Sequence, residues 1–377
     1  MIAAAVLLCS LAWQEPEPVA VEVQDLSPKL EGFRESNALP ALAAALWKDG
    51  QLVAHGAVGH RALGQDAKVT TKDQWHLGSD TKAMTAVLMA ILVEEGKLSW
   101  QSTIGDVFAD LKKEIHEDWA EVTLEQLLQH RSGLAEDRVP DAVIFPALRK
   151  LKGPMREQRR ALVKMVLAAP PKEDPGTVFQ YSNHGYTVAG AMAEAVCEQS
   201  WETLMQERLF QPLGMDSAGF GPPGVAEEVQ QPQGHYLSLP IPPGPSADNP
   251  AVWGPAGTVH ASLEDWGKFL NLFLTTPPSA EDVASGEAKK PLLSAESLEK
   301  LMHPSADNYA LGWMVFEREW GDGMVLTHSG SNGMWFAVTW VAPKKGFAAM
   351  AVTNCATAKA GGACDKVIGA LIRLAQR

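Results

Sequence analysis

The sequence has no apolar run of the roughly 18 residues that a membrane-spanning helix needs. It also lacks a surplus of basic residues, because 32 Lys and Arg stand against 45 Asp and Glu, a net charge of −13. Nucleic acids and anionic membrane surfaces both select basic faces. We therefore expect neither a nucleic-acid partner nor a transmembrane span.

Cysteine is scarce, with four residues in the chain, and none lies in a CxxC pair or in a His/Cys cluster with zinc-ligand spacing. The sequence thus gives no reason to expect a metal or another cofactor. Cys197 lies in an alanine-rich, helix-like run, where a buried small hydrophobic residue is expected. Cys355 and Cys364 flank a short glycine-containing segment and could form a disulfide, although spacing alone does not establish the geometry.

A third absence is the Gly-x-Ser-x-Gly elbow that carries the nucleophile of α/β-hydrolases, which excludes that fold. What is present is an ordinary globular composition, with 46% hydrophobic and 20% charged residues. The length of 377 residues is more than twice the roughly 150 of a common domain, so the chain forms either one large domain or two.

The N-terminus changes character abruptly. Residues 1–12 are almost wholly apolar and end in small residues, and an acidic, proline-containing stretch follows them. This pattern predicts a signal peptide at 1–12, a lead segment at 13–27, and export to the periplasm or the medium. No lysine or arginine precedes the apolar run, so the alternatives are a frayed N-terminal helix or a true start codon upstream, and the protein would otherwise be cytoplasmic.

The apolar pattern predicts both strands and helices. Runs at 41–47 and 52–58 are joined through Asp49-Gly50, a strong signal for a β-hairpin. A helix is expected over 79–95, and it is apolar on nearly all sides, which is typical of a helix at the centre of a domain. Near the C-terminus the pattern predicts strands at 309–317, 324–328, 334–341 and 347–354 and a closing helix at 364–377.

The simplest packing of these elements is an α+β fold. The first and last strands join into an antiparallel sheet with flanking helices, and a largely helical lobe at about 78–305 lies beside it. Helices of the lobe are expected to begin after the capping residues Thr123, Ser200 and Ser262. Segment 221–257 contains nine prolines and is expected to be a long surface loop without regular structure.

Three short motifs can carry chemistry, and the first opens the buried helix. Ser79 and Lys82 have i, i+3 spacing, so their side chains share one face of a helix. A serine hydroxyl becomes a good nucleophile when a base takes its proton, and a lysine can do so where burial favours its neutral form. The same spacing recurs at Ser297 and Lys300 in a charged helix, so spacing alone is a weak signal.

The second motif is Tyr181-Ser182-Asn183, which follows a turn signal and precedes an alanine-rich helix. A tyrosine beside a cation can carry protons, and an asparagine amide can orient a substrate carbonyl. Taken alone, the motif is equally consistent with a turn and a helix cap.

The third motif is His328-Ser329-Gly330, which is followed by Ser331 and ends an expected strand. Gly330 permits close approach of the backbone, so the strand could present N–H groups to a substrate. Taken alone, this motif is also typical of the end of an ordinary hairpin.

The order of the three motifs resembles that of the serine β-lactamase and penicillin-binding-protein superfamily. The sequence is most similar to the class C β-lactamase-like branch, which includes esterases and D-amino-acid peptidases. The further stretches that fit this branch are 127–134 (LLQHRSGL), 181–186 (YSNHGY), 209–215 (LFQPLGM) and 255–259 (PAGTV). The resemblance runs from about residue 39 to the C-terminus and implies a single catalytic domain, expected at 28–377.

The resemblance implies a role for each motif. Ser79 would be the acylated nucleophile, and Lys82 and Tyr181 would share the proton transfers. The backbone N–H groups of Ser79 and Ser331 would form the oxyanion hole, and no metal is required. The residues implied in substrate binding are Asn183, His328, Ser329, Gly330 and Ser331.

The sequence departs from the family pattern at His328, where many relatives that bind a substrate carboxylate have lysine. A histidine is mostly neutral near pH 7, so a carboxylate should be attracted more weakly unless Arg131 or another cation compensates. Trp313 and Trp335 flank the motif and could either line an apolar acyl pocket or belong to the core of the sheet.

The resulting hypothesis is a serine hydrolase that acts through an acyl-enzyme on a small ester or amide, of the esterase, D-aminopeptidase or D-peptidase type. A β-lactamase or a D-alanyl-D-alanine carboxypeptidase is the alternative within enzymes. A non-catalytic binding or sensing module on the same fold is the alternative of another class. The expected partner is a small ester, amide or peptide.

Overall fold

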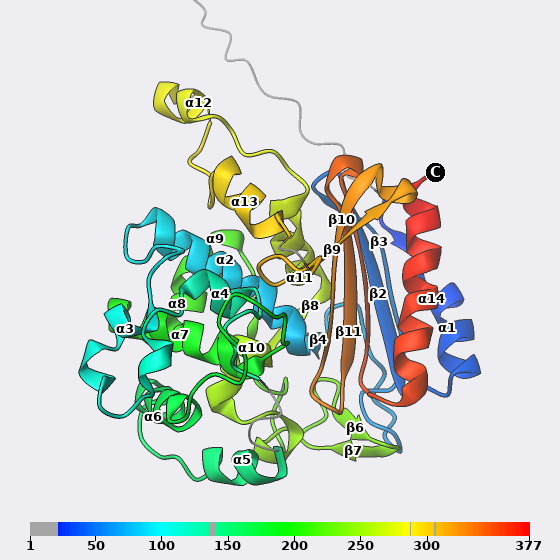
Figure 1. Ribbon diagram of the computed structural model, residues 1–377. Helices are drawn as coiled ribbons and strands as arrows, with labels where there is room; N and C mark the ends of the chain where they lie inside the picture. The colour runs from blue at the N-terminus through cyan, green and yellow to red at the C-terminus, as the bar shows by residue number, and fades with distance from the viewer. Residues whose placement is uncertain (1–21, 136–140, 287, 305–306) are drawn as a thin grey trace, which may run out of the picture.

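The computed structural model describes residues 22–135, 141–286, 288–304 and 307–377. The expected signal peptide at 1–12 and most of the expected lead segment lie outside these residues. Within the described part of the chain, no helix combines the length and apolarity needed to cross a membrane. A large sheet with two helices on its outer face lies beside a group of helices (Figure 1).

The large sheet joins the two ends of the chain. Its strands, in the order β1-β3-β2-β12-β11-β10-β9, are β1 (Gln24–Asp25), β3 (Gln51–Gly59), β2 (Ala41–Lys48), β12 (Phe347–Thr353), β11 (Phe336–Ala342), β10 (Gly323–Ser331) and β9 (Met314–Arg318). The pairing of β2 with β12 is antiparallel, as predicted. β1 is the exception, because it pairs in parallel with β3, and the sheet therefore begins before residue 28.

The β2–β3 hairpin shows why this sheet is apolar on both faces. Asp49 and Gly50 both have positive φ, 49° and 79°, which is the geometry of the tight turn that Asp-Gly predicts. Alternate side chains of a strand point to opposite faces. Leu42 and Ala44 enter a core under the outer helices α1 (Ser27–Ser36) and α14 (Ala358–Ala375), whereas Ala43 and Ala45 enter the core shared with the helical part.

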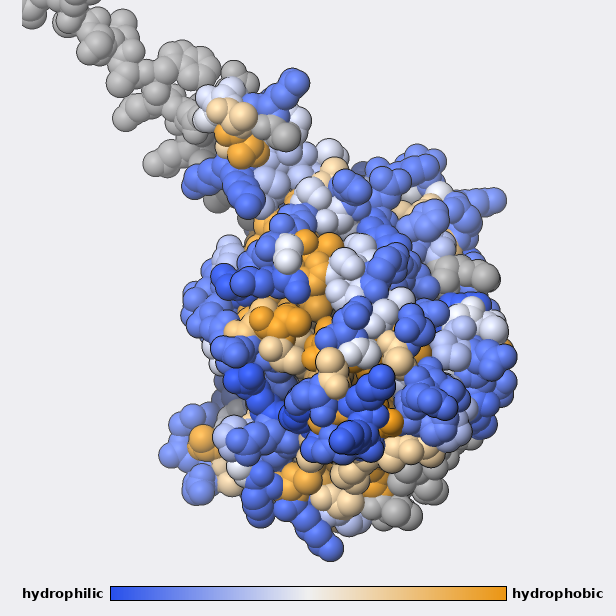
Figure 2. Space-filling model, turned by 60° about the vertical axis from the view of Figure 1, so that its left-hand side comes forward, coloured by the Kyte–Doolittle hydropathy of each residue, from blue (hydrophilic) through white to orange (hydrophobic). Residues whose placement is uncertain are grey.

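The remaining helices lie on the other side of the sheet from α1 and α14 (Figure 1). Their order is α2 (Thr81–Glu94), α3 (Ile104–Val107), α4 (Leu124–Leu128), α5 (Asp141–Leu148), α6 (Met155–Leu167), α7 (Asn183–Cys197), α8 (Trp201–Met205), α9 (Gln211–Leu213), α10 (Gly254–Gly257), α11 (Leu263–Leu270), α12 (Ala280–Ser285) and α13 (Ala295–Met302). Thr123, Ser200 and Ser262 cap α4, α8 and α11 through their side chains, as predicted. Hydrophilic side chains cover much of the surface on this side (Figure 2).

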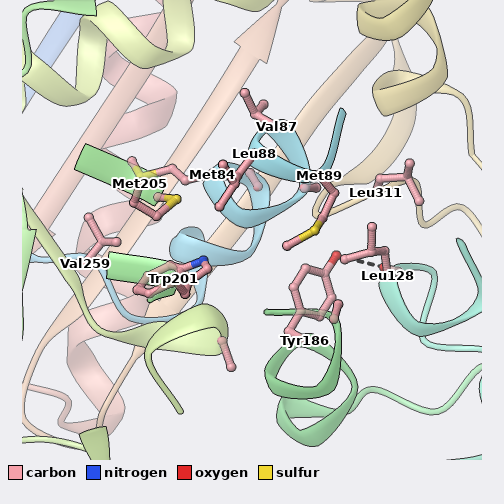
Figure 3. Close-up of a cluster of buried hydrophobic side chains, with 14 of the residues drawn as sticks. Met84, Val87, Leu88, Met89, Leu128, Tyr186, Trp201, Met205, Val259 and Leu311 are labelled. Atoms are coloured by element: carbon pink, nitrogen blue, oxygen red, sulfur yellow. Dashed lines mark hydrogen bonds between the residues drawn. The ribbon is translucent and has the colours of Figure 1, made fainter. Parts of the chain in front are cut away.

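Helix α2 is the central helix that the sequence predicts. Every residue from Thr81 to Leu92 is buried, because neighbouring elements cover the helix on all sides. Figure 3 shows Met84, Leu88 and Met89 among apolar side chains from α7, α8 and β8 (Val259–Ser262). A short 3-10 turn, Gly78–Asp80, leads into the helix.

The proline-rich segment 221–257 contains regular structure, contrary to expectation. It holds the hairpin of β6 (Gly234–Tyr236) and β7 (Leu239–Ile241) as well as helix α10. Prolines are compatible with these elements because β7 lies at the edge of a two-stranded sheet with β6, and because Pro255 lies in the first turn of α10. Two more short strands, β4 (Gln74–His76) and β5 (Gly219–Phe220), flank β8 in a three-stranded sheet.

The strand expected at 309–317 begins only at Met314. The preceding segment bends at Asn308 and Gly312, which have φ of 56° and 86°. A Cβ on Gly312 would lie 2.5 Å from the backbone of Ala83, so this segment packs against α2 instead of extending the sheet. The closing helix α14 also begins earlier than residue 364, at Ala358.

The sequence left open the roles of two pairs of residues, and both pairs lie in the interior. Cys355 and Cys364 are both buried, and neither is in a disulfide. Trp313 and Trp335 are each 1% exposed and pack in the core, against Phe273 and Trp75. They therefore belong to the core and do not form the wall of an acyl pocket.

Candidate active site

Ser79 and Lys82 meet at the start of α2. Ser79 is half-buried in the 3-10 turn, and Lys82 lies one turn further along. The Lys82 Nζ atom is 3.1 Å from Ser79 Oγ, and the lysine is wholly buried. The second Ser-x-x-Lys pair differs, because Lys300 forms an ion pair with Glu125 instead.

The Lys82 amine is surrounded by oxygen acceptors. Its Nζ donates to Asn183 Oδ1 at 2.6 Å and to the Ala256 carbonyl at 2.7 Å. It also lies 4.7 Å from the centre of the Tyr181 ring. Asn183 and Ala256 accept through oxygen only, so the Lys82 amine donates to both, and Ser79 Oγ lies within hydrogen-bonding distance of the same nitrogen. Sequence reasoning missed the Ala256 carbonyl, which belongs to α10.

The third motif lies directly against the turn that carries Ser79. A Cβ on Gly330 would lie 1.9 Å from the Leu77 carbonyl and 2.5 Å from Ser79 N, so only glycine allows this approach. A Cβ on Gly78 would likewise lie 2.3 Å from Ser331 N. The end of β10 and the start of α2 are therefore in backbone contact, as the motif order implied.

His328 and Ser329 turn toward a different set of groups. The His328 Nδ1 atom is 2.9 Å from the Ser329 carbonyl, which can only accept, so the neutral ring carries its proton on Nδ1. Its Nε2 then accepts from the Tyr309 hydroxyl at 3.3 Å. That hydroxyl also lies 3.2 Å from His130 Nε2, and His130 Nδ1 accepts from the Ser182 N–H at 3.0 Å. A buried His130–Tyr309–His328 chain thus connects the second and third motifs.

Sequence reasoning did not single out His130 or Tyr309 as site residues. His130 lies inside the 127–134 stretch that carries the family resemblance, so a signal was present. No signal in the sequence marked Tyr309 as a site residue, because the apolar pattern placed it in a strand.

Burial controls the charge state of the three side chains His130, Tyr309 and His328. It lowers the pKa of His328 to about 3. Burial likewise holds the pKa of His130 well below its usual value and raises that of Tyr309 well above. All three groups are therefore neutral near pH 7.

A pocket of about 300 Å³ opens beside Tyr181. Its wall includes Tyr309, His328 and Asp307. Arg131, the cation considered above, contacts Asp307 and donates to the carbonyls of Gly176 and Thr177 at 2.6 and 2.9 Å. Its charge is thus already balanced by a carboxylate at the pocket rim.

The depressed pKa of His328 predicts a loss of stability in acid. The His328 side chain has its ordinary pKa of 6.5 in the unfolded chain and a pKa of about 3 in the folded protein. The unfolded state therefore binds more protons between these values, and the free energy of unfolding falls as the pH drops from 6.5 to 3. One such group contributes a slope of about 1.4 kcal/mol per pH unit. When the free energy of unfolding is measured by urea denaturation between about pH 4 and 6, its dependence on pH should be smaller in His328→Gln than in the wild type by up to this amount. An unchanged slope would contradict a neutral, buried His328.

The sequence model of the family described as Beta-lactamase matches residues 26–371. Penicillin-binding protein 4 of Amycolatopsis lactamdurans is 27% identical over 334 residues, which cover 86% of this chain and 84% of the relative. The unguisins hydrolase of Aspergillus campestris is 27% identical over 310 residues, which cover 77% of this chain and 54% of the relative, so this chain spans about half of its length.

Solved structures show the same arrangement. The octameric penicillin-binding protein homologue from Pyrococcus abyssi matches with a TM-score of 0.70 at 23% identity, covering 93% of this chain and 77% of that one. SurE matches with a TM-score of 0.70 at 22% identity, covering 93% of this chain and 75% of that one. At such identities the likeness concerns the fold alone, and it confirms the predicted α+β architecture.

Proposed function

Because the chain belongs to the Beta-lactamase family, whose members are serine hydrolases, we propose that it hydrolyses a small uncharged ester or amide through an acyl-enzyme on Ser79. The observation that carries the proposal is the buried Lys82 amine, 3.1 Å from the Ser79 hydroxyl. A base within hydrogen-bonding distance of a serine is what nucleophilic catalysis requires.

Acylation begins when Ser79 Oγ attacks the substrate carbonyl carbon and Lys82 Nζ takes the hydroxyl proton. Negative charge develops on the carbonyl oxygen, where the backbone N–H groups of Ser79 and Ser331 stabilise it. One such donor lowers the barrier by about 3 kcal/mol. The bond to the leaving group then breaks, and the alcohol or amine takes the proton from Lys82, either directly or through Tyr181.

Deacylation repeats these steps with water as the attacking group. Lys82, neutral again, takes a proton from the water, directly or relayed through the Tyr181 hydroxyl, as the water oxygen attacks the acyl carbon. The bond from that carbon to Ser79 Oγ breaks, and the serine recovers its proton. The product leaves as a carboxylic acid and the enzyme returns to its starting state.

The pocket supports the preference for an uncharged substrate. His328 is neutral because burial lowers its pKa, and Arg131 is paired with Asp307. A substrate carboxylate there would meet a carboxylate and no lysine or arginine among the described lining residues. The similarity to a penicillin-binding protein makes a peptidase of the D-alanyl type the second candidate.

Labelling with a fluorophosphonate, read by mass spectrometry, tests the proposal. We expect an adduct on the Ser79 peptide of the wild-type protein and none in Ser79→Ala. Ser297→Ala is the matched control, because it removes the serine of the other Ser-x-x-Lys pair, and it should label like the wild type.

Turnover of three substrates then tests the substrate class. We expect a p-nitrophenyl ester to be hydrolysed faster than a chromogenic cephalosporin or a D-Ala-D-Ala peptide. A cephalosporin turned over far faster than the ester would favour a β-lactamase. If neither a fluorophosphonate nor a penicillin forms an adduct on Ser79, the protein is a binding module.

A further inference from the structure

One oxygen of Asp248 joins two segments that flank the site. Asp248 lies in the proline-rich segment before α10 and is 7% exposed. Its Oδ1 accepts a hydrogen bond from Asn332 Nδ2 at 3.0 Å. The same oxygen lies 2.8 Å from His76 Nε2, a close polar contact that is not aligned as a linear hydrogen bond.

His76 connects Asp248 to the turn that carries Ser79. It is the last residue of β4 and is 1% exposed. Its Nδ1 accepts from the Gly78 N–H at 3.1 Å, so Nε2, the nitrogen beside Asp248, carries a proton. Gly78 immediately precedes Ser79, and its φ of 54° marks a tight turn. His76 therefore fixes this turn through its hydrogen bond with Gly78.

Asn332 connects Asp248 to the end of β10. It immediately follows Ser331, and its Nδ2 also donates to the Ala247 carbonyl at 3.2 Å. Its Oδ1 accepts from the Met334 N–H at 3.1 Å. The side-chain amide is thus engaged at both ends, which fixes the chain just beyond Ser331.

We propose that Asp248, acting through His76 and Asn332, is a positioning residue that sets the spacing between the backbone N–H groups of Ser79 and Ser331. This inference rests on the proposed function, in which those two groups form the oxyanion hole. They belong to separate segments, the turn before α2 and the end of β10. A misplacement of about 1 Å at such a site can cost on the order of 10²-fold in rate, so a carboxylate that contacts both segments matters for catalysis.

Replacement of Asp248 tests this role. We expect Asp248→Ala to lower kcat on the p-nitrophenyl ester by about tenfold or more while KM stays within about threefold. Affinity for a boronic acid, which forms a tetrahedral adduct on serine, should fall in parallel with kcat. Asp248→Asn keeps an acceptor oxygen for both partners and should retain most of the activity.

Two further variants separate positioning from stability. Asn332→Ala leaves the Asp248–His76 contact in place and removes the contact at the β10 end, together with the Asn332 bonds to Ala247 and Met334. Because Asn332 is half-buried, the variant should lower kcat in the same direction even if Asp248→Ala does not fold. Asp265→Ala is the matched control, because Asp265 is 5% exposed and hydrogen-bonded to Ser217 and Lys268 in α11. It should destabilise the protein without lowering kcat.

The outcomes distinguish this inference from the function on which it rests. If wild-type protein labels at Ser79 but Asp248→Ala and Asn332→Ala keep kcat within twofold, the positioning role is wrong and the proposed function stands. An equal loss of kcat in Asp265→Ala, or a change confined to KM, also overturns it. If wild-type protein neither labels nor turns over ester, both proposals fail together.

Discussion

Replacing Lys82 by methionine is expected to lower kcat on the order of 10³-fold or more, because the variant has no base beside Ser79. The side chain keeps its approximate length, so the surrounding core should remain packed. Asn183 Oδ1 and the Ala256 carbonyl lose a donor, which we expect to destabilise the fold by about 1–3 kcal/mol. Steady-state hydrolysis of a p-nitrophenyl ester and the rate of fluorophosphonate labelling measure the effect.

Lys300→Met is the matched control for this experiment. Lys300 has the same spacing from a serine, but its amine pairs with Glu125 and is partly exposed. Loss of such a pair costs about 1 kcal/mol or less, and kcat should stay within twofold of the wild type. A Lys82→Met protein that keeps a tenth of the wild-type kcat would contradict the role of Lys82 as the base.

The second large effect is expected for Gly330→Ala. The added methyl group would lie 1.9 Å from the Leu77 carbonyl and 2.5 Å from Ser79 N, both of them backbone atoms that no rotamer change can move. The end of β10 must therefore separate from the turn before α2. We expect a loss of about 2–3 kcal/mol in the free energy of unfolding and a fall in kcat of about 10²-fold, because Ser331 N moves relative to Ser79.

Gly362→Ala provides the comparison. Gly362 lies within α14, and a Cβ there meets no atom within 4 Å. Alanine is the better helix former by about 0.5–1 kcal/mol, so this variant should be slightly more stable and fully active. Denaturant unfolding and ester kinetics on both variants decide the matter. If Gly330→Ala matches the wild type in stability and rate, the close approach at β10 has no role.

Predictions from local sequence signals agree best with the structure. The Asp49-Gly50 turn, the capping residues of α4, α8 and α11, and the all-round apolar helix α2 each depend on interactions within a few residues. The Ser79–Lys82 contact belongs to the same class, because helical geometry alone brings i and i+3 together.

Contacts between residues far apart in the sequence could not be predicted in this way. Asp248 contacts His76, 172 residues before it (248 − 76), and Asn332, 84 residues after it, and neither spacing nor periodicity in the sequence indicates these contacts. Tyr309 was expected in a strand because an apolar run does not reveal the bend at Gly312 that packs this segment on α2. The parallel pairing of β1 was missed because two polar residues, Gln24 and Asp25, carry no strand pattern.

The pairing of β2 with β12 has a consequence for how the protein reaches its native state. Ala45 is opposite Met350, so most of the polypeptide must be synthesised before the middle of the sheet can close. Contacts so distant in sequence slow folding and leave apolar strand edges exposed in the meantime. The β2–β3 hairpin is synthesised first, and it remains without its neighbour β12 until the end of the chain has been made. We therefore expect slow refolding after dilution from denaturant, and a strong requirement for protection from aggregation while the last strands are still missing.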